Sequence, residues 1–271
     1  MARSVEVMVL AGNGINCELE TAHACRLAGA DRVEIVYLWD LASGRAGLGD
    51  YEMLCLPGGF LDGDDLGSAR ASAIRIRHTR VGGETLLDQL KRFVADGGLM
   101  IGICNGFQLM VKLGLLPALE SRGEGQQLTL TWNDSGRFED RWVDLAVDRE
   151  SPCVFTRGLS RLSLPVRHGE GRIVAADETV LKEVDERHRA PLRYVDPRSG
   201  EPTESYPHNP NGSPGGVAAL TDESGRLLGM MPHPEGFLDR TNHPRWTRED
   251  LPEQGDGLAL FKNAVEFLKN G

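Results

Sequence analysis

One stretch of the chain passes directly from an expected strand into an expected helix: Leu99-Met100-Ile101-Gly102-Ile103-Cys104-Asn105-Gly106-Phe107. The apolar run 99–103 predicts a buried strand, and a helical pattern runs from Asn105 to Leu113. A cysteine on such a turn has cramped backbone, and the glycines on either side let strand and helix pass closely; the serine version is the nucleophile elbow. The unpaired N–H groups of the helix N-terminus favour thiolate over thiol. We therefore expect Cys104 to be a nucleophile.

The other cysteines lack this glycine bracket. A free cysteine is most often a small buried hydrophobic residue. We expect that role for the four others: Cys17, Cys25, Cys55 and Cys153.

Strand and helix patterns alternate over residues 1–115, which predicts a parallel sheet with right-handed crossovers. We expect buried strands at 5–10, 32–38 and 53–56, a helix capped by Asn16 that stops at Gly29, and a helix at 85–95. The pattern at 127–195 is strand-like, 197–216 is an expected long loop, and two more strands at 217–221 and 227–231 precede a helix at 258–268. No repeat or linker divides the chain. We predict one α/β domain over 1–271, with a mixed, mostly parallel sheet flanked by helices.

Composition excludes several classes of protein. The 30 basic and 40 acidic side chains give a net charge of −10, which argues against nucleic acid and anionic membranes as partners. No run approaches the length of a membrane span. Five cysteines without paired spacing make no disulfide framework, so a reducing, cytoplasmic location is expected. Glycine is the outlier, at 33 of 271 residues against a usual value near 7%.

A histidine suited to acid–base work follows the expected strand at 227–231. In Met231-Pro232-His233-Pro234-Glu235 the prolines hold the backbone extended, so His233 and Glu235 project to the same side. Glu235 then orients the imidazole, as the third member of a catalytic triad does. We expect His233 to be the partner of Cys104.

Adjacent glycines follow the expected strand at 53–56. The Pro57-Gly58-Gly59 turn permits a backbone that aims N–H groups at a developing oxyanion. The three segments meet at the carboxyl edge of the sheet, where open α/β sheets place their sites.

Four other interpretations compete with this one. A nicotinamide-binding site is disfavoured because Cys17 occupies the third glycine position of the pattern that starts at Gly12. No metal site is predicted, because the histidines lack paired ligand spacing and Asp62, Asp64 and Asp65 lack the rest of a calcium loop. A cysteine hydrolase or peptidase on the same scaffold, and a non-catalytic binding subunit, stay open from the residues alone.

These segments resemble the class I, triad-type glutamine amidotransferases, which share a PGG turn, a GxCxG elbow and an HPE ending on a flavodoxin-like fold. Further segments narrow the resemblance to the glutaminase part of phosphoribosylformylglycinamidine (FGAM) synthases: 16–22, 57–67, 133–139, 168–171 and 209–213. The resemblance covers nearly the whole chain. The alternative within the class is a glutaminase subunit of another amidotransferase.

The resemblance implies that Cys104 attacks the side-chain amide of glutamine while N–H groups near Gly58, Gly59 and Asn105 hold the oxyanion. Gln108 is implied to hold the amino-acid portion of the substrate. Ammonia then passes to a separate, ATP-dependent synthetase subunit that converts FGAR to FGAM in purine biosynthesis, assisted by a small third subunit. ATP and magnesium are expected on that partner, and no cofactor in this chain.

The chain departs from the family pattern at two places. Gly236 follows Glu235 where relatives commonly carry arginine, and the 11–14 turn lacks the usual proline. For His168 and Glu170, a place at the subunit interface and a simple polar turn stay open.

Overall fold

A six-stranded sheet runs through the centre of the computed structural model, which describes residues 3–123 and 125–271. Its strand order is β12-β13-β6-β3-β1-β2, and every neighbouring pair is parallel except β12 with β13. The strands are β1 (Glu6–Ala11), β2 (Arg32–Tyr37), β3 (Met53–Leu56), β6 (Leu99–Ile103), β12 (Ala219–Thr221) and β13 (Leu227–Met230). The order from β2 inward is the flavodoxin-like one. The predicted mixed, mostly parallel sheet is confirmed.

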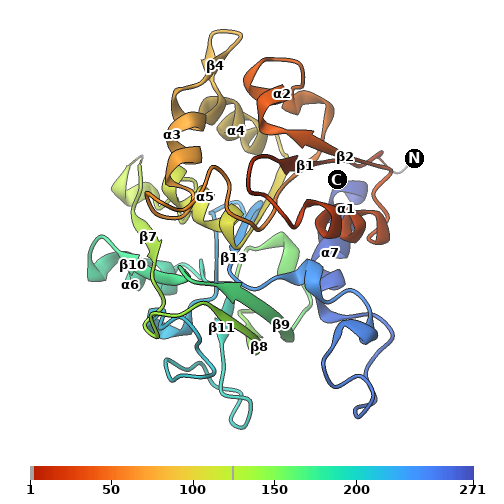
Figure 1. Ribbon diagram of the computed structural model, residues 1–271, viewed down its shortest axis with the longest axis vertical. Helices are drawn as coiled ribbons and strands as arrows, with labels where there is room; N and C mark the ends of the chain where they lie inside the picture. The colour runs from red at the N-terminus through yellow and green to blue at the C-terminus, as the bar shows by residue number, and fades with distance from the viewer. Residues whose placement is uncertain (1–2, 124) are drawn as a thin grey trace.

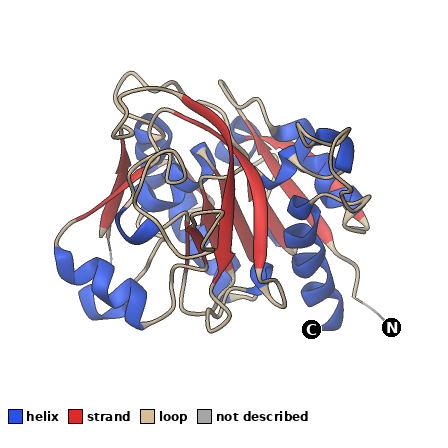
Figure 2. Cartoon of the chain, turned by 90° about the horizontal axis from the view of Figure 1, so that it is seen from below, coloured by secondary structure: helices blue, strands red, loops and turns tan. Residues whose placement is uncertain are grey.

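Helices cover both faces of this sheet (Figure 2). Helices α1 (Glu18–Leu27) and α7 (Asp256–Asn270) contact each other, whereas α3 (Arg70–His78) contacts both α4 (Leu86–Ala95) and α5 (Asn105–Leu113). The described residues that lead into β1, from residue 3 on, lie near the C-terminal end of α7 (Figure 1). The Lys269 ammonium donates to the carbonyl of Gly29 there, at 2.7 Å, and so ties α7 to the end of α1.

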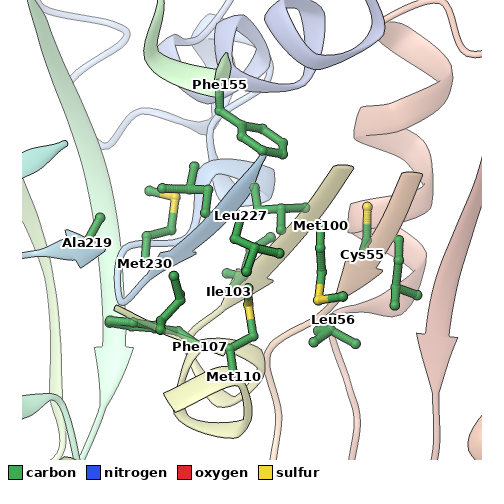
Figure 3. Packing of buried hydrophobic residues seen from close by; sticks show 14 of the residues in the cluster. Cys55, Leu56, Met100, Ile103, Phe107, Met110, Phe155, Ala219, Leu227 and Met230 are labelled. Atoms are coloured by element: carbon green, nitrogen blue, oxygen red, sulfur yellow. The ribbon is translucent and has the colours of Figure 1, made fainter. Parts of the chain in front are cut away.

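The core is built on both sides of β6 and β13 (Figure 3). Phe107 and Met110 of α5 lie against these strands from one side, and Phe155, in a 3₁₀ turn at Val154–Thr156, approaches from the other. Gly229 of β13 leaves room for Phe107, because a Cβ at this position would lie 2.1 Å from its ring. This close packing fixes α5, and with it the turn at Cys104.

The middle of the chain forms smaller sheets beside the central one. Antiparallel β8 (Glu139–Val147), β9 (Arg161–His168) and β11 (Leu192–Tyr194) make one, and β7 (Leu128–Thr131) pairs with β10 (Arg172–Ala175) in another. The expectation of strands in this region is correct except at the 3₁₀ turn of Val154–Thr156 and at helix α6 (Glu178–Glu186). That helix begins there because the Asp177 side chain caps it, accepting from the Thr179 N–H.

Other predictions of detail are wrong. The cap residue of α1 is Cys17, and the Asn16 side-chain oxygen instead accepts from the Cys17 thiol. Strand β2 is an edge strand, largely half-exposed, because only β1 pairs with it. The short helix α2 (Leu38–Ala42), helix α3 and the hairpin of β4 (Arg80–Val81) and β5 (Glu84–Thr85) were not anticipated. No helix within 3–123 or 125–271 is long and apolar enough to cross a membrane.

Candidate active site

Cys104 occupies a strained turn between β6 and α5. Its φ of 51° and ψ of −102° lie where residues with a side chain rarely stay, at a cost of about 1–3 kcal/mol. The bracketing glycines make the turn possible: a Cβ on Gly106 would lie 1.9 Å from the Leu56 carbonyl oxygen, and one on Gly102 would lie 2.7 Å from the Gly106 oxygen. The Cys104 N–H donates to the carbonyl of Met230 at 2.8 Å. Its thiol is thus held at the carboxyl end of β6.

The loop after β3 is held beside this turn by two sets of contacts. The Phe60 N–H donates to the Gly14 carbonyl at 2.7 Å, and the Leu61 N–H donates to the side-chain oxygen of Asn105 at 2.9 Å. Gly59 takes a φ of +140°, and a Cβ on Gly14 would lie 2.1 Å from the Phe60 oxygen. The glycine turn after β1 therefore packs on protein backbone. These backbone contacts account for the glycines of this turn without a bound dinucleotide phosphate.

His233 and Glu235 meet as predicted, although by a different backbone route. The Nδ1 of His233 lies 2.6 Å from Oε1 of Glu235, and the His233 N–H donates to the Pro165 carbonyl of β9 at 2.8 Å. His233 is extended as predicted, but Pro234–Gly236 form a 3₁₀ turn that folds Glu235 back to the imidazole. Helix α7 supports this turn, because Gly257 lies against the Pro234 carbonyl oxygen so closely that a Cβ would be 1.8 Å away.

The pKa of His233 stands well above its usual value. Burial alone lowers this pKa, but the charge of Glu235, the nearby thiols of Cys104 and Cys17, and the hydrogen bond to Glu235 outweigh the effect of burial. Nε2 of His233 is buried without a hydrogen bond of normal geometry. The charged imidazolium is therefore favoured next to both thiols, with one ring nitrogen available to a bound molecule.

A cavity of about 480 Å³ opens over these groups. Cys104, His233, Glu235, Gly59 and Gln108 all line it. Its remaining lining residues are Asn16, Cys17, Glu20, Phe60, Asp64, Ser68, Trp132, Phe138, Arg167, His168, Gly169, Glu170 and Gly236. Such a volume is typical of small-molecule sites.

Two of the predicted binding residues lie behind the cavity wall. Gly58 faces the imidazole, where a Cβ would lie 2.7 Å from Cε1 of His233. The Asn105 side chain is buried and joins the loop after β3 to Gln108, whose side-chain oxygen accepts from it at 3.0 Å. The other end of the Gln108 amide donates to the Glu170 carbonyl at 2.6 Å. Both side chains thus brace the wall through bonds within the protein.

His168 is the last residue of β9, Glu170 lies in the turn that follows it before β10, and both line the cavity. Nδ1 of His168 lies 3.1 Å from the Asn133 side-chain oxygen, and burial, together with the charge of His233, lowers the pKa of His168 to about 3. His168 is therefore neutral at neutral pH. The Glu170 carboxylate accepts from the Ser68 N–H at 3.2 Å. Both residues lie far from Cys104 in the sequence, and no sequence pattern indicated that they line the same cavity.

The prediction that Cys17 is a packing residue is wrong. It is half-buried, lines the cavity and lies close to His233, whereas Cys25, Cys55 and Cys153 are fully buried. Burial raises the pKa of the Cys17 thiol, and the interaction with His233 opposes that rise.

Three aromatic side chains stand exposed at the mouth of the cavity. They are Phe60, Trp132 and Phe138, with exposed fractions of 45%, 65% and 56%. Large apolar side chains gathered at the mouth of a cavity are typical of a surface that meets a partner.

Comparison with known proteins places this geometry in a family. A model described as "CobB/CobQ-like glutamine amidotransferase domain" matches residues 4–268. A protein of Dehalococcoides mccartyi named "Phosphoribosylformylglycinamidine synthase subunit PurQ" is 43% identical over 265 residues, which is 98% of each chain. A protein of the same name from Methanococcus maripaludis is 41% identical over 274 residues, covering 97% of this chain and 98% of that one. The chain belongs to the PurQ family of glutamine amidotransferases.

A solved structure supports the same assignment. "Structure of PurLQS from Thermotoga maritima" matches with a TM-score of 0.71 and 28% identity, over 98% of this chain and 100% of that chain. The family resemblance found in the sequence is thereby confirmed. Membership of the PurQ family also favours an enzyme over a non-catalytic binding subunit.

Gly236 is the residue beside the triad segment at which the chain departs from the family pattern. A Cβ at this position would lie 2.9 Å from the ring of Pro165.

Proposed function

We propose that this chain is the glutaminase subunit of an FGAM synthase: it hydrolyses glutamine at Cys104 and passes the ammonia to an ATP-dependent synthetase. The observation that carries the proposal is one cavity that brings the Cys104 turn and the bonded His233–Glu235 pair together. Full-length similarity to proteins named PurQ supports the substrate and the pathway. A peptidase or other cysteine hydrolase is disfavoured by the same similarity.

The first half of the reaction forms a thioester. The Cys104 sulfur attacks the carboxamide carbon of glutamine, and the carbonyl oxygen becomes an oxyanion. Protonated His233 gives its proton to the amide nitrogen, the C–N bond breaks, and ammonia leaves a γ-glutamyl thioester on Cys104. The raised pKa of His233 supports this role, because the imidazolium is the form that has a proton to give.

The second half releases glutamate. Neutral His233 takes a proton from water, and the resulting hydroxide attacks the thioester carbon. The C–S bond breaks, glutamate departs, and the thiolate is restored opposite the imidazolium. Glu235 holds His233 in the required orientation and stabilises its charge through the 2.6 Å contact at Nδ1.

Backbone N–H groups are proposed to stabilise the oxyanion. The first N–H groups of α5 have no partner within the helix, and that of Asn105 directly follows the nucleophile. Gly59 contributes the opposite side, because its positive φ turns the loop backbone toward the cavity. Gly58 and the Asn105 side chain hold this arrangement from behind, and Gln108 shapes the wall against which the amino-acid end of glutamine lies.

The chain is proposed to act in a cytoplasmic complex with a PurL-type synthetase and a small PurS-type subunit, as the Thermotoga structure of PurLQS suggests. ATP and magnesium belong on the synthetase in this proposal. The cavity supports that division because Glu20, Asp64 and Glu170 line it, and carboxylates repel a triphosphate. The exposed aromatic residues at its mouth give the synthetase a surface to cover.

A glutaminase assay with the synthetase present tests the chemistry. Wild type is expected to release glutamate from glutamine, and Cys104→Ala is expected to reduce that release to background. Undiminished release by Cys104→Ala, in a folded variant, refutes the assignment of the nucleophile.

The pathway is tested by growth of a strain that lacks its own FGAM synthase glutaminase subunit. The gene is expected to restore growth without purines, with Cys104→Ala as the negative control. Failure to restore growth, together with intact glutaminase activity, assigns the chain to another amidotransferase.

A further inference from the structure

Cys17 lies in the active-site cavity, and the proposed reaction does not use it. It caps α1 and lines the cavity together with His233 and Glu235. Its sulfur and the His233 ring approach the same point from two sides: a Cβ on Gly58 would lie 3.3 Å from Sγ of Cys17 and 2.7 Å from Cε1 of His233. One candidate ligand atom from each of Cys17, His233 and Glu235 lies within 4.8 Å of the other two.

Two of these three side chains carry buried atoms that have no hydrogen-bond partner. They are Nε2 of His233 and Oε2 of Glu235, on side chains that are each 3% exposed. A buried polar atom without a partner is costly, and its presence calls for a bound group. The third side chain, Cys17, is half-buried and so remains accessible from the cavity.

The chemistry of the three groups selects one class of ion. Thiolate, imidazole and carboxylate are the ligands of zinc, whereas magnesium and calcium prefer oxygen alone. Nδ1 of His233 now lies 2.6 Å from Oε1 of Glu235, and an ion that takes both residues as ligands replaces this hydrogen bond. In a tetrahedral zinc site, with bonds of about 2.0–2.3 Å, ligand atoms lie roughly 3–4 Å apart. Small side-chain movements therefore bring these groups around one ion.

We propose that Cys17, His233 and Glu235 form an inhibitory site for a divalent transition-metal ion of the zinc type. Binding displaces the Cys17 thiol proton and one proton of the His233 imidazolium, both of which go to solvent, and it forms metal–sulfur and metal–nitrogen bonds without any change of oxidation state. A lone pair of His233 is taken up by the ion, so the imidazole no longer shuttles protons for Cys104. The inhibitory consequence rests on the proposed glutaminase function; the binding itself does not.

Cobalt(II) provides a test of binding that is independent of catalysis. It takes the place of zinc in tetrahedral sites, and a thiolate ligand gives it a charge-transfer absorption in the near ultraviolet. The full-length Cys104→Ala chain leaves Cys17 as the thiol in the cavity, and it is expected to show this band and to lose it when zinc is added. The band is expected to be absent from Cys17→Ala/Cys104→Ala, and to persist in the matched control His23→Ala/Cys104→Ala, which removes an exposed histidine of α1 that does not line the cavity.

Two results overturn the site. One is a Cys104→Ala chain that gives no thiolate band; the other is a band that survives removal of Cys17. Cys17→Ser/Cys104→Ala serves as a second variant, and circular dichroism establishes that each chain is folded. Removal of a direct ligand is expected to weaken zinc binding by more than the 10–100-fold that loss of an outer-shell partner costs.

Inhibition is tested on the complex with the synthetase. Zinc is expected to inhibit glutamate release by wild type, a chelator to restore it, and Cys17→Ser to raise the half-inhibitory concentration by more than about 10-fold. His23→Ala is expected to behave as wild type. Equal inhibition with and without Cys17 overturns the inhibitory role. Absence of glutaminase activity in every chain without zinc refutes the proposed function and leaves the cobalt result to decide the metal site.

Discussion

Gly106→Ala tests whether close contact between α5 and β3 positions the nucleophile. Two effects oppose each other in this variant. Alanine favours a helix over glycine by about 0.8–1.0 kcal/mol. Against this, the new Cβ would lie 1.9 Å from the Leu56 carbonyl oxygen, a backbone atom, and real Cβ atoms essentially never come within 3.0 Å. The start of α5 must therefore move by about 1.1 Å, the difference between these two distances.

The displacement is expected to prevail over helix propensity. Overpacking costs about 1–3 kcal/mol or more, and subtracting the gain in helix propensity leaves a net loss of up to about 2 kcal/mol. For a chain of this size that lowers Tm by up to about 8 °C. The activity falls further, because α5 carries Cys104 at its start and a misplacement of about 1 Å costs on the order of 10²-fold in rate.

Calorimetry and the glutaminase assay measure the two effects together. Gly47→Ala is the matched control: it has an ordinary φ of −134° and no atom within 4 Å of the Cβ position, so Tm and activity are expected to stay near wild type. If Gly106→Ala keeps the wild-type Tm and kcat, the close contact does not position the nucleophile and the reasoning is refuted.

Three further predictions concern buried polar groups. Glu235→Gln is expected to lower glutamate release by about 10²–10⁴-fold, as loss of the orienting group does in other triads. The same change alters how the free energy of unfolding depends on pH. The raised pKa of His233 contributes stability that is fully present below pH 6.5 and is lost as the pH rises through the pKa of His233 in the folded protein. Glu235→Gln is expected to lose less stability than wild type over this rise in pH. For His168 the effect of pH on stability has the opposite sign. Because the pKa of His168 falls from 6.5 to about 3 on folding, the free energy of unfolding decreases as the pH is lowered from 6.5 to about 3, by up to about 1.4 kcal/mol per pH unit. A folded His168→Asn chain that loses as much stability as wild type over this pH range contradicts the prediction. Asn105→Ala leaves the buried Leu61 N–H unpaired and is expected to cost about 1–3 kcal/mol in urea unfolding, where a change below 0.5 kcal/mol would count against the role of the side chain.

The parallel half of the fold was predictable because its signals are local. The runs at 53–56 and 99–103 are apolar throughout and end at glycine-rich turns, so their bounds agree with β3 and β6. Helix α3 lacked such a signal, because it is rich in arginine and has no capping side chain. The carboxyl ends of the parallel strands then brought Cys104 and His233 together by topology alone.

The inner wall of the site was not predictable, because it depends on contacts between distant segments. The role of Cys17 follows from the contact between two glycine loops, and no feature of its neighbours in sequence distinguishes it from a packing residue. Likewise, Gln108 reaches the Glu170 carbonyl across 62 positions of sequence. Glu235 meets His233 through a 3₁₀ turn, which a strand pattern does not encode.

The close contact between Pro234 and Gly257 makes helix α7 part of the structure that holds the catalytic histidine in place. The nucleophile turn lies in the first half of the chain, while the base stands on a turn that α7 supports from beneath. During synthesis the cysteine therefore leaves the ribosome well before its proton donor has any support. We therefore expect the nascent chain to be unable to consume glutamine until α7 has emerged and docked against the turn that carries His233.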